Sequence, residues 1–212
     1  RARLNLLSEI PYAWKRAVHR WAGLNRSFRR DDLPDRNTEY LLYQTLVGAW
    51  PVSVDRIQAY MEKAVKEAKT HTSWTQPDAE YESTVHSFID SICENEPFIS
   101  DLESFVEALI GPGRINSLAQ TLVKLTAPGI PDIYQGTELW NLSLVDPDNR
   151  RPVDYNLRLK RLAEMKQTPT PDILQRMKDA IPRLWVIRQT LSLRKRRPEL
   201  FGPDSSYEPL KA

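Results

Sequence analysis

The chain has 212 residues, of which 41% are hydrophobic, so it is long enough to bury a core and to form one or two domains. Its 30 basic and 28 acidic residues leave a net charge of +2, which gives no electrostatic reason to expect binding to nucleic acid or to an anionic membrane. No stretch approaches the roughly eighteen consecutive apolar residues of a membrane helix. The composition therefore favours a globular protein without a membrane or nucleic-acid partner.

Cys93 is the single cysteine, so an intrachain disulfide is impossible, and a reducing cytoplasm is the expected location. The start of the chain lacks both an initiator methionine and the apolar core of a signal peptide, which suggests a fragment. A nucleophilic Cys93 paired with a histidine remains an alternative. Because Cys93 ends an apolar helical face, a buried structural thiol is the favoured interpretation.

Helical spacing of apolar residues dominates the first part of the chain. It predicts helices over Pro11 to Leu24, Thr38 to Ala49, Val54 to Ala68 with Ser53 as the cap, and Tyr81 to Ile92.

A capping-box spacing of Ser100 and Glu103 predicts that the next helix starts there. The sequence Gly111-Pro-Gly113 is typical of a helix stop. A separate helix is then expected from Ile115 to Leu125.

The run Ile130 to Tyr134 is short, apolar and rich in strand formers, and it follows a Pro-Gly turn at Pro128. The order of predicted helix, Pro-Gly turn, short strand and polar loop is the order expected for one βα repeat of a parallel barrel. Since one strand cannot make a sheet, the other strands are expected outside this chain.

Further helices are predicted over Tyr155 to Met165 and Asp179 to Arg197. The basic run from Arg194 to Arg197 is interpreted as the cationic last turn of a helix, with an anion site as the alternative. The tail from Phe201 to Ala212 is expected to lead into a further strand.

The densest functional signal is the polar loop that follows the predicted strand. Its carboxylates and guanidiniums offer hydrogen bonds of the kind that sugar hydroxyls accept, and its aromatic rings could stack on pyranose faces. An ordinary Asp-Pro-Asp-Asn turn with surface ion pairs remains an equally good interpretation. These residues are Asp146, Asp148, Asp154, Arg150 and Arg151, with Tyr134, Trp140 and Tyr155.

A second candidate is the polar loop from Lys69 to Trp74, for which a solvent-facing loop is the favoured alternative when the residues are considered alone. Three histidines, His19, His71 and His86, lack the spacing of zinc ligands, so no metal and no cofactor are expected.

Several segments in the same order resemble the malto-oligosyltrehalose synthases, a family of the α-amylase clan of glycoside hydrolases. The segment Ala127 to Gly136 resembles the eighth-strand region of the clan. Three further stretches narrow the resemblance to the synthases: Lys66 to Glu82, Asn116 to Leu125, and Gly136 to Tyr155.

The resemblance implies a (β/α)8 barrel that rearranges the reducing-end α-1,4 bond of a maltodextrin into an α,α-1,1 bond. The implied mechanism is a retaining double displacement with an aspartate nucleophile and a glutamate acid. The family's three catalytic carboxylates would precede Arg1, so the fragment is expected to be inactive alone and no catalytic residue is assigned in it.

The implied fold class is a mainly α fragment of an α/β parent. Residues 1–114 would be a helical segment and insertion after the seventh strand, residues 115–166 the last barrel βα unit with a substrate loop, and residues 167–212 helices leading into a truncated β domain. Substrate-binding residues implied by the resemblance are Lys69, His71, Thr72, Trp74, Tyr134, Gln135, Gly136, Glu138, Asp146, Asp148, Asn149, Arg150 and Arg151.

Two alternatives stay open at this point. Another α-amylase-clan hydrolase or glucosyltransferase would share the strand segment, whereas the stretch from Lys66 to Tyr81 is associated with the synthases. A helical interaction module without enzymatic activity would have to unfold cooperatively without an exposed apolar surface. A barrel remnant would instead expose the surface that packs on the remainder of its barrel, and the fragment would tend to self-associate.

Overall fold

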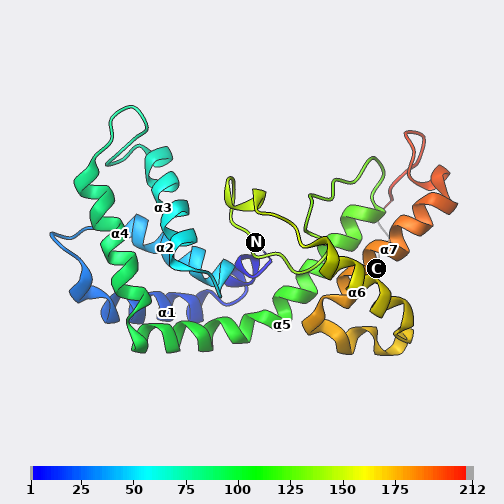
Figure 1. Ribbon diagram of the computed structural model, residues 1–212, viewed down its shortest axis with the longest axis horizontal. Helices are drawn as coiled ribbons and strands as arrows, with labels where there is room; N and C mark the ends of the chain where they lie inside the picture. The colour runs from blue at the N-terminus through cyan, green and yellow to red at the C-terminus, as the bar shows by residue number, and fades with distance from the viewer. Residues whose placement is uncertain (1, 209–212) are drawn as a thin grey trace. The chain divides into compact units, whose positions relative to one another are not determined.

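A computed structural model describes residues 2–208 of the chain, and these residues form two compact units. Unit 1 comprises Arg1–Gly113 with Leu142–Arg151, and unit 2 comprises Arg114–Asn141 with Pro152–Ala212. Helices dominate both units (Figure 1), and no residue from 2 to 208 lies in a strand. The prediction of a mainly α fragment is therefore confirmed.

Unit 1 is built from helices joined by short loops, with α3 packed along α4. Its elements are η1 (Leu4–Ser8), α1 (Pro11–Leu24), η2 (Arg26–Phe28), α2 (Arg36–Ala49), α3 (Val54–Ala68), α4 (Ala79–Cys93), the first part of α5 (Glu96–Thr126) and η3 (Asp148–Arg150).

Side-chain caps start two of these helices. Asp35 accepts hydrogen bonds from the backbone amides of Asn37 and Thr38 at the start of α2, and Asp78 accepts one from Tyr81 at the start of α4. Ser53 occupies the N-cap position of α3 as predicted, but its side chain makes no capping hydrogen bond. The expected capping contribution of Ser53 was therefore wrong, although the helix boundary was right.

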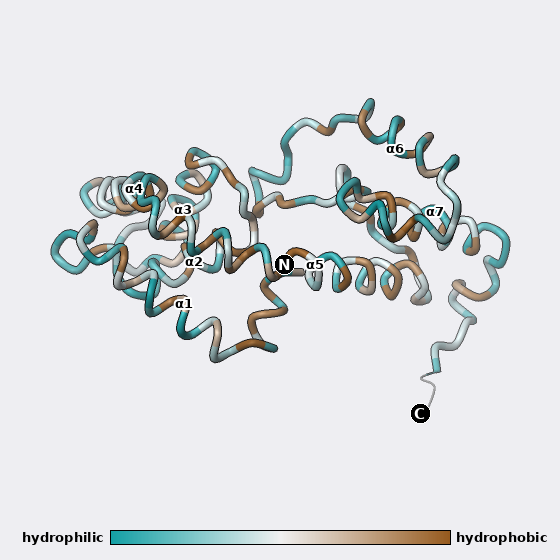
Figure 2. Tube along the Cα trace, turned by 90° about the horizontal axis from the view of Figure 1, so that it is seen from below, coloured by the Kyte–Doolittle hydropathy of each residue, from teal (hydrophilic) through white to brown (hydrophobic). Residues whose placement is uncertain are grey.

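An aromatic cluster forms the centre of unit 1. Trp21 makes edge-to-face contacts with Tyr43, Phe98 and Phe105, with ring centroids 5.5 to 5.8 Å apart. Trp14 packs on the same ring of Trp21 at 5.7 Å. The helical spacing predicted for Pro11 to Leu24 thus places two tryptophans in one core. Figure 2 shows hydrophobic and hydrophilic residues alternating along the turns of α5.

Helix α5 runs without interruption from Glu96 to Thr126 and includes Pro112. The predicted start at Ser100 and the predicted stop at Gly111 are therefore both wrong. The capping-box residues lie inside the helix, where Phe98 and Leu102 are buried in the core of unit 1. Burial of this apolar face outweighs the local preference of the Gly-Pro-Gly sequence, because packing provides most of the stability of a helix in a protein.

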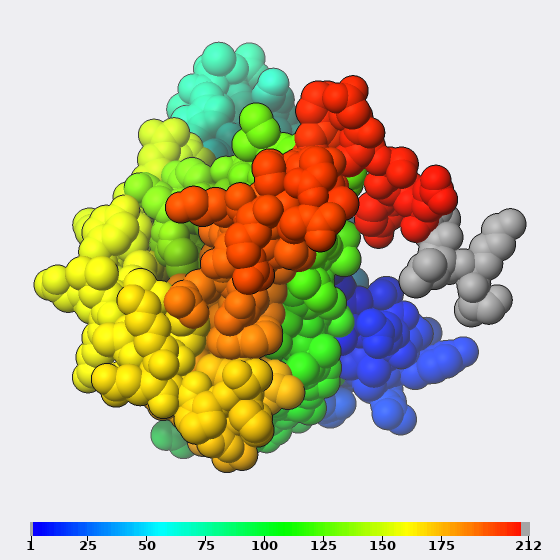
Figure 3. All heavy atoms as spheres, turned by 90° about the vertical axis from the view of Figure 1, so that its right-hand side faces the viewer, coloured from blue at the N-terminus to red at the C-terminus, as the bar shows by residue number. Residues whose placement is uncertain are grey.

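Unit 2 contains the end of α5 and a packed group of later helices. These are α6 (Tyr155–Gln167), η4 (Thr170–Asp179), α7 (Ile181–Arg196) and η5 (Pro198–Leu200). Met165, Ile173, Ile181 and Leu184 form their core. Figure 3 shows this group as one packed face, coloured from yellow to red. The predicted helices over Tyr155 to Met165 and Asp179 to Arg197 are confirmed, while η4 was not predicted.

The predicted strand from Ile130 to Tyr134 does not form, and the segment has no regular structure. Ile130 is fully exposed, at 101%. An apolar run needs a neighbouring strand to pair its backbone groups, and no strand occurs among the described residues to supply one. Residues 201–208 likewise contain no strand, and the rest of the predicted tail strand lies outside the described residues.

The basic run at the end of α7 has the helix-terminal position that was predicted for it. Arg194 donates hydrogen bonds to the carbonyl oxygens of Leu125 at 3.1 Å and Ala127 at 2.9 Å, at the end of α5. The guanidinium thus satisfies carbonyls that the helix leaves without partners. No helix within residues 2–208 is long and apolar enough to cross a membrane.

Candidate substrate loop and its surroundings

The loop Leu142–Arg151 belongs to unit 1, where it is fastened to α3. Arg56 on α3 makes a bidentate pair with Asp148, with Nε to Oδ1 at 2.7 Å and Nη2 to Oδ2 at 2.8 Å. Nη2 of Arg56 also donates to the carbonyl oxygen of Leu142 at 3.1 Å, and the amide of Leu144 donates to Asp148 at 2.6 Å. Asp148 therefore fixes both the end and the beginning of the loop.

Burial strengthens this pair. The side chains of Arg56 and Asp148 are only 21% and 10% exposed. The hydrogen bonds from Arg56 hold the pKa of the Asp148 carboxyl below its usual value. Asp148 is thus a structural anion whose acceptor capacity is used within the protein.

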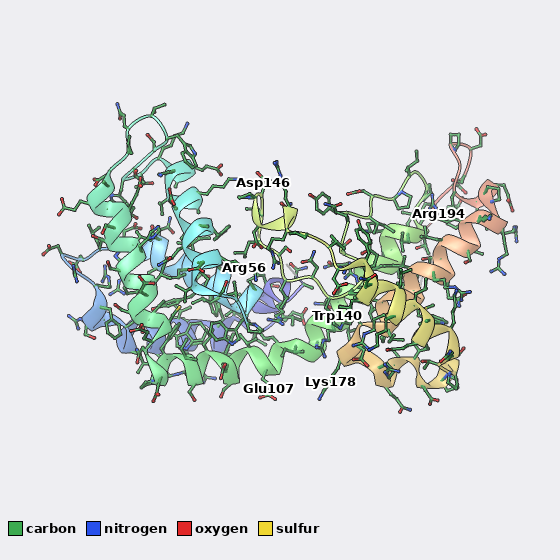
Figure 4. All side chains as sticks on the ribbon, viewed as in Figure 1. Arg56, Glu107, Trp140, Asp146, Lys178 and Arg194 are labelled. Atoms are coloured by element: carbon green, nitrogen blue, oxygen red, sulfur yellow. The ribbon has the colours of Figure 1, made fainter. Side chains whose placement is uncertain are left out.

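A second attachment lies about two turns further along α3, at Lys63. Lys63 donates to the backbone carbonyl oxygen of Asp146 at 2.7 Å, and its ammonium lies 3.8 Å from the Asp146 carboxylate. Figure 4 labels Arg56 on α3 and Asp146 on the loop beside it. Two cations on one helix therefore hold the same loop.

The other predicted residues of the loop differ in their partners and in their exposure to solvent. Arg150 forms an ion pair between its Nε and Oδ1 of Asp146. Oδ1 of Asn149 is buried and has no hydrogen-bond partner among the described residues. Arg151 donates to the carbonyl oxygen of Asp148 and to the hydroxyl of Ser143, both at 3.1 Å, and its side chain stays 49% exposed. Nε of Arg151 also lies 3.2 Å from Oδ1 of Asp148, so this guanidinium is half-exposed and held within the loop, whereas the side chain of Arg150 is 70% exposed.

The predicted segment from Lys69 to Trp74 follows the end of α3 in the same unit. Lys69 adopts the left-handed conformation, with φ of 57°, at the C-cap. His71 stacks on the ring of Tyr81 with centroids 4.5 Å apart, and its Nε2 lies 3.4 Å from Asp35. The imidazole therefore contacts the helix starts of α2 and α4, while the side chain of His71 remains 36% exposed.

Thr72 and Trp74 have opposite environments. Thr72 is buried, accepts a hydrogen bond from the amide of Asp78 at 2.9 Å and donates to Glu82 at 2.5 Å. Trp74 is 60% exposed, and the Lys66 ammonium lies 4.8 Å from the centre of its ring. Thr72 therefore braces the loop, whereas the ring of Trp74 is open to a ligand.

Lys66 joins this loop to the helices on either side. Its ammonium donates to Glu62 at 2.6 Å and lies 3.2 Å from Glu82. Hydrogen bonding to Glu62, followed by Glu82, raises the pKa of Lys66, and the Thr72 hydroxyl is the main cause of a lowered pKa of Glu82. Lys66 is thus paired with two carboxylates while its ammonium lies against the ring of Trp74.

The predicted residues Tyr134, Gln135, Gly136 and Glu138 belong to unit 2. They form a turn in which the Thr137 amide donates to the carbonyl oxygen of Tyr134 at 3.1 Å. Gly136 has a φ of +85°, and an added Cβ would meet Val153 at 3.2 Å, so the turn requires glycine. Arg158 on α6 donates to Glu138 at 3.0 Å and to the carbonyl oxygen of Gly136 at 2.6 Å. Glu138 thus braces the turn.

Trp140 and Tyr155, singled out as stacking candidates, also lie in unit 2. The indole of Trp140 donates to the carbonyl oxygen of Met177 at 2.7 Å, and the guanidiniums of Arg114 and Arg183 lie 5.8 and 6.0 Å from its ring. Trp140 is therefore held by its neighbours. Tyr155 is 60% exposed at the start of α6.

Arg56, Lys63 and Arg158 were not predicted from the sequence, although they position the predicted residues. Arg56 and Asp148 are 92 positions apart, and an arginine on the polar side of a helix carries no signal of its distant partner.

Cys93 is partly buried at the end of α4, where burial raises the pKa of its thiol to about 11, which favours a structural thiol over a nucleophile.

Within the described part of the chain, no three His, Cys, Asp or Glu side chains are grouped so that they could hold a metal ion.

Comparison with known proteins adds the family. The chain is 36% identical, over 219 aligned residues that include all of it, to curated maltooligosyl trehalose synthases from two strains of Mycobacterium tuberculosis. It spans 26% of their length. No protein-family model matches the chain.

Solved structures agree with these relatives. A crystal structure of a maltooligosyl trehalose synthase superposes with a TM-score of 0.88 at 34% identity, covering 100% of this chain and 29% of that one. The enzyme from Arthrobacter ramosus gives a TM-score of 0.82 at 38% identity, covering 94% of this chain and 25% of that one. Fold and sequence together define a mainly helical part of a larger protein of this kind. The family resemblance is confirmed: the chain is homologous to a C-terminal part of the maltooligosyl trehalose synthases.

Proposed function

We propose that this chain is the C-terminal part of an enzyme that converts the reducing-end α-1,4 linkage of maltodextrins into an α,α-1,1 linkage by intramolecular transglycosylation. The similarity over the whole chain, at 36% identity to relatives named as maltooligosyl trehalose synthases, is the observation that carries this proposal. The reaction is an isomerisation that serves trehalose biosynthesis, and we assign it to the cytoplasm.

In this proposal the chemistry belongs to carboxylates outside the chain. A nucleophilic aspartate would form a glycosyl-enzyme while a glutamate protonates the leaving oxygen. The freed glucose must remain bound, turn and attack through its anomeric hydroxyl, so water has to be kept from the intermediate. The fragment alone would bind no complete substrate and would be inactive.

The loop Leu142–Arg151 would contribute to holding that glucose. Its half-exposed Arg151 keeps guanidinium surface available for sugar hydroxyls, while Asp148 is committed to Arg56. Trp74 offers an open aromatic face. We therefore assign direct sugar contact to Arg151 and Trp74. Positioning is assigned to Thr72, Gly136, Glu138 and Asp148, and the other predicted residues (Lys69, His71, Tyr134, Gln135, Asp146, Asn149 and Arg150) keep a proposed place in the site.

The remainder of the barrel is the proposed partner of unit 2. Ile115, Leu122 and Val123 on α5 are 54%, 46% and 59% exposed. Large apolar side chains grouped along one helix favour contact with further protein. The isolated fragment should accordingly self-associate.

The test is to give the complete protein maltopentaose and to follow reducing ends and free glucose together. Rearrangement consumes reducing ends and releases little glucose, so loss of reducing ends without glucose is the expected result. A rise in reducing ends would show a hydrolase and would contradict the proposal.

A further inference from the structure

A cavity of about 750 Å³ lies between α1 and α2, within unit 1. Its lining includes His19, Gly23 and Arg26 from one side and Arg36, Glu39 and Tyr40 from the other. This volume is within the range of roughly 300 to 1,000 Å³ that is typical of sites for small molecules. The size alone thus admits a ligand as large as a substituted monosaccharide.

The charges around the cavity select the kind of ligand. The lining contains two arginines, Arg26 and Arg36, and a single acid, Glu39. The guanidinium of Arg26 makes no hydrogen bond or ion pair to another described residue, and neither does the side chain of His19. Unpaired donors that face a cavity favour an anion.

Glu39 is the one acid in the lining, and its charge is already compensated. The residue is 2% exposed, its Oε2 accepts a hydrogen bond from Arg36 at 2.7 Å, and its Oε1 accepts one from the Tyr43 hydroxyl at 2.8 Å. Asn25 in turn donates to the Tyr43 oxygen at 3.1 Å, and burial raises the pKa of Tyr43 well above its usual value. Glu39 therefore fixes the position of Arg36 through a hydrogen bond. The net charge of the lining side chains is still positive, because two arginines face one carboxylate.

The helix surface inside the cavity has room for an uncharged ring. A Cβ added at Gly23 would meet nothing within 4 Å. Across from it, the partly exposed ring of Tyr40 offers an aromatic face. A pyranose or similar ring could lie between these two surfaces while the cations hold a charged substituent.

From this arrangement we propose that the cavity between α1 and α2 binds a small organic phosphate of the size of a hexose phosphate, with Arg26 and Arg36 holding the phosphate. This site goes beyond the proposed rearrangement, which requires no phosphorylated ligand. It rests only on residues of unit 1.

Isothermal titration of the complete protein with glucose 6-phosphate, inorganic phosphate and glucose tests the proposal. Glucose 6-phosphate should bind at one site, inorganic phosphate at least about tenfold more weakly, and glucose without measurable heat, because the charged contact and the ring contact are both needed. Equal affinity for inorganic phosphate, or no binding of glucose 6-phosphate, would overturn the assignment.

Three variants separate a built cavity from diffuse positive charge. Arg26→Ala removes a cation from the lining, and Gly23→Leu fills the cavity without changing any charge; each should weaken glucose 6-phosphate binding at least about tenfold. Arg16→Ala removes an exposed cation of α1 that does not line the cavity, and it should leave the affinity nearly unchanged. Equal losses in Arg16→Ala and Arg26→Ala, with Gly23→Leu unaffected, would show charge attraction alone. Thermal unfolding of each variant verifies that the protein remains folded.

Discussion

At the scale of single residues, the position of the loop Leu142–Arg151 depends most on Asp148. Its two carboxylate oxygens accept hydrogen bonds from Arg56 on α3 and from the backbone amide of Leu144. Both members of the ion pair are largely buried, so neither could be fully solvated if its partner were removed. The pair is therefore expected to affect stability more than an exposed ion pair does.

Replacing Asp148 with Asn should lower the free energy of unfolding by about 1–3 kcal/mol at neutral pH, because Arg56 loses its counter-charge. The folded-state pKa of Asp148 is lowered, so its stabilising effect is complete above the unfolded pKa of about 3.9 and disappears as pH falls through the folded value. The stability difference between wild type and variant should thus be constant from about pH 7 to 5 and shrink below about pH 4. Urea unfolding over this pH range measures it.

Asp132→Asn is the matched control, since Asp132 is exposed in the irregular segment before the turn at Gly136. It should change the free energy of unfolding by less than about 0.5 kcal/mol. Equal effects of the two substitutions, or a difference between wild type and Asp148→Asn that persists unchanged in acid, would contradict the role of the ion pair.

The sequence indicated Asp148 and Arg151 because carboxylates and guanidiniums are concentrated in one loop. The sequence could not show that Asp148 is already bonded within the protein while Arg151 stays half-exposed. That difference depends on Arg56, which lies 92 positions away from Asp148. The same limit applies to Thr72, which was grouped with Trp74 because both lie in one polar loop. Only the fold shows that Thr72 is buried and Trp74 is not.

At the scale of elements, α5 is the feature whose local sequence and observed structure disagree most. Pro112 lies inside the helix, has no amide hydrogen to donate to the fourth residue before it, and carries a ring that crowds that carbonyl. The helix nevertheless continues to Thr126. Its continuity should therefore depend on packing on both sides of the proline.

If α5 is continuous, Pro112→Ala should raise the free energy of unfolding by at least about 1 kcal/mol, because alanine restores the missing donor and removes the clash. Gly111→Ala, at a position where an added Cβ meets nothing within 4 Å, should give a gain of up to about 1 kcal/mol. Urea unfolding of the two variants measures both effects. Destabilisation by both would indicate that the chain needs a break at these residues.

Most helices were predictable because apolar residues recur at helical spacing, as in α1, α6 and α7. The errors lie where a short local pattern competes with tertiary structure. Ile130 to Tyr134 has strand composition but no neighbouring strand among the described residues. Gly111 to Gly113 has the residues of a helix stop but lies inside the continuous helix α5. Composition identifies a preference, whereas pairing and packing decide whether the preference is realised.

At the scale of the whole molecule, the chain spans about a quarter of the length of its curated relatives. Its mainly helical structure and its family could be predicted from ordered sequence segments. The proposed contribution of those helices to sugar binding could not be predicted, because it depends on the fold around each side chain. We propose that unit 1 contributes by holding the freed glucose while water is excluded.

The most direct test is the kinetics of Trp74→Ala and Arg151→Ala in the complete protein with maltopentaose. If each side chain contributes about 1.4 kcal/mol to sugar contact, kcat/KM for rearrangement should fall at least about tenfold in each variant, and the share of free glucose among the products should rise. Glu107→Gln, which removes the charge of an exposed side chain on α5, is the control and should match wild type. Unchanged kcat/KM and an unchanged glucose share in both variants would contradict the claim that this helical unit holds the sugar.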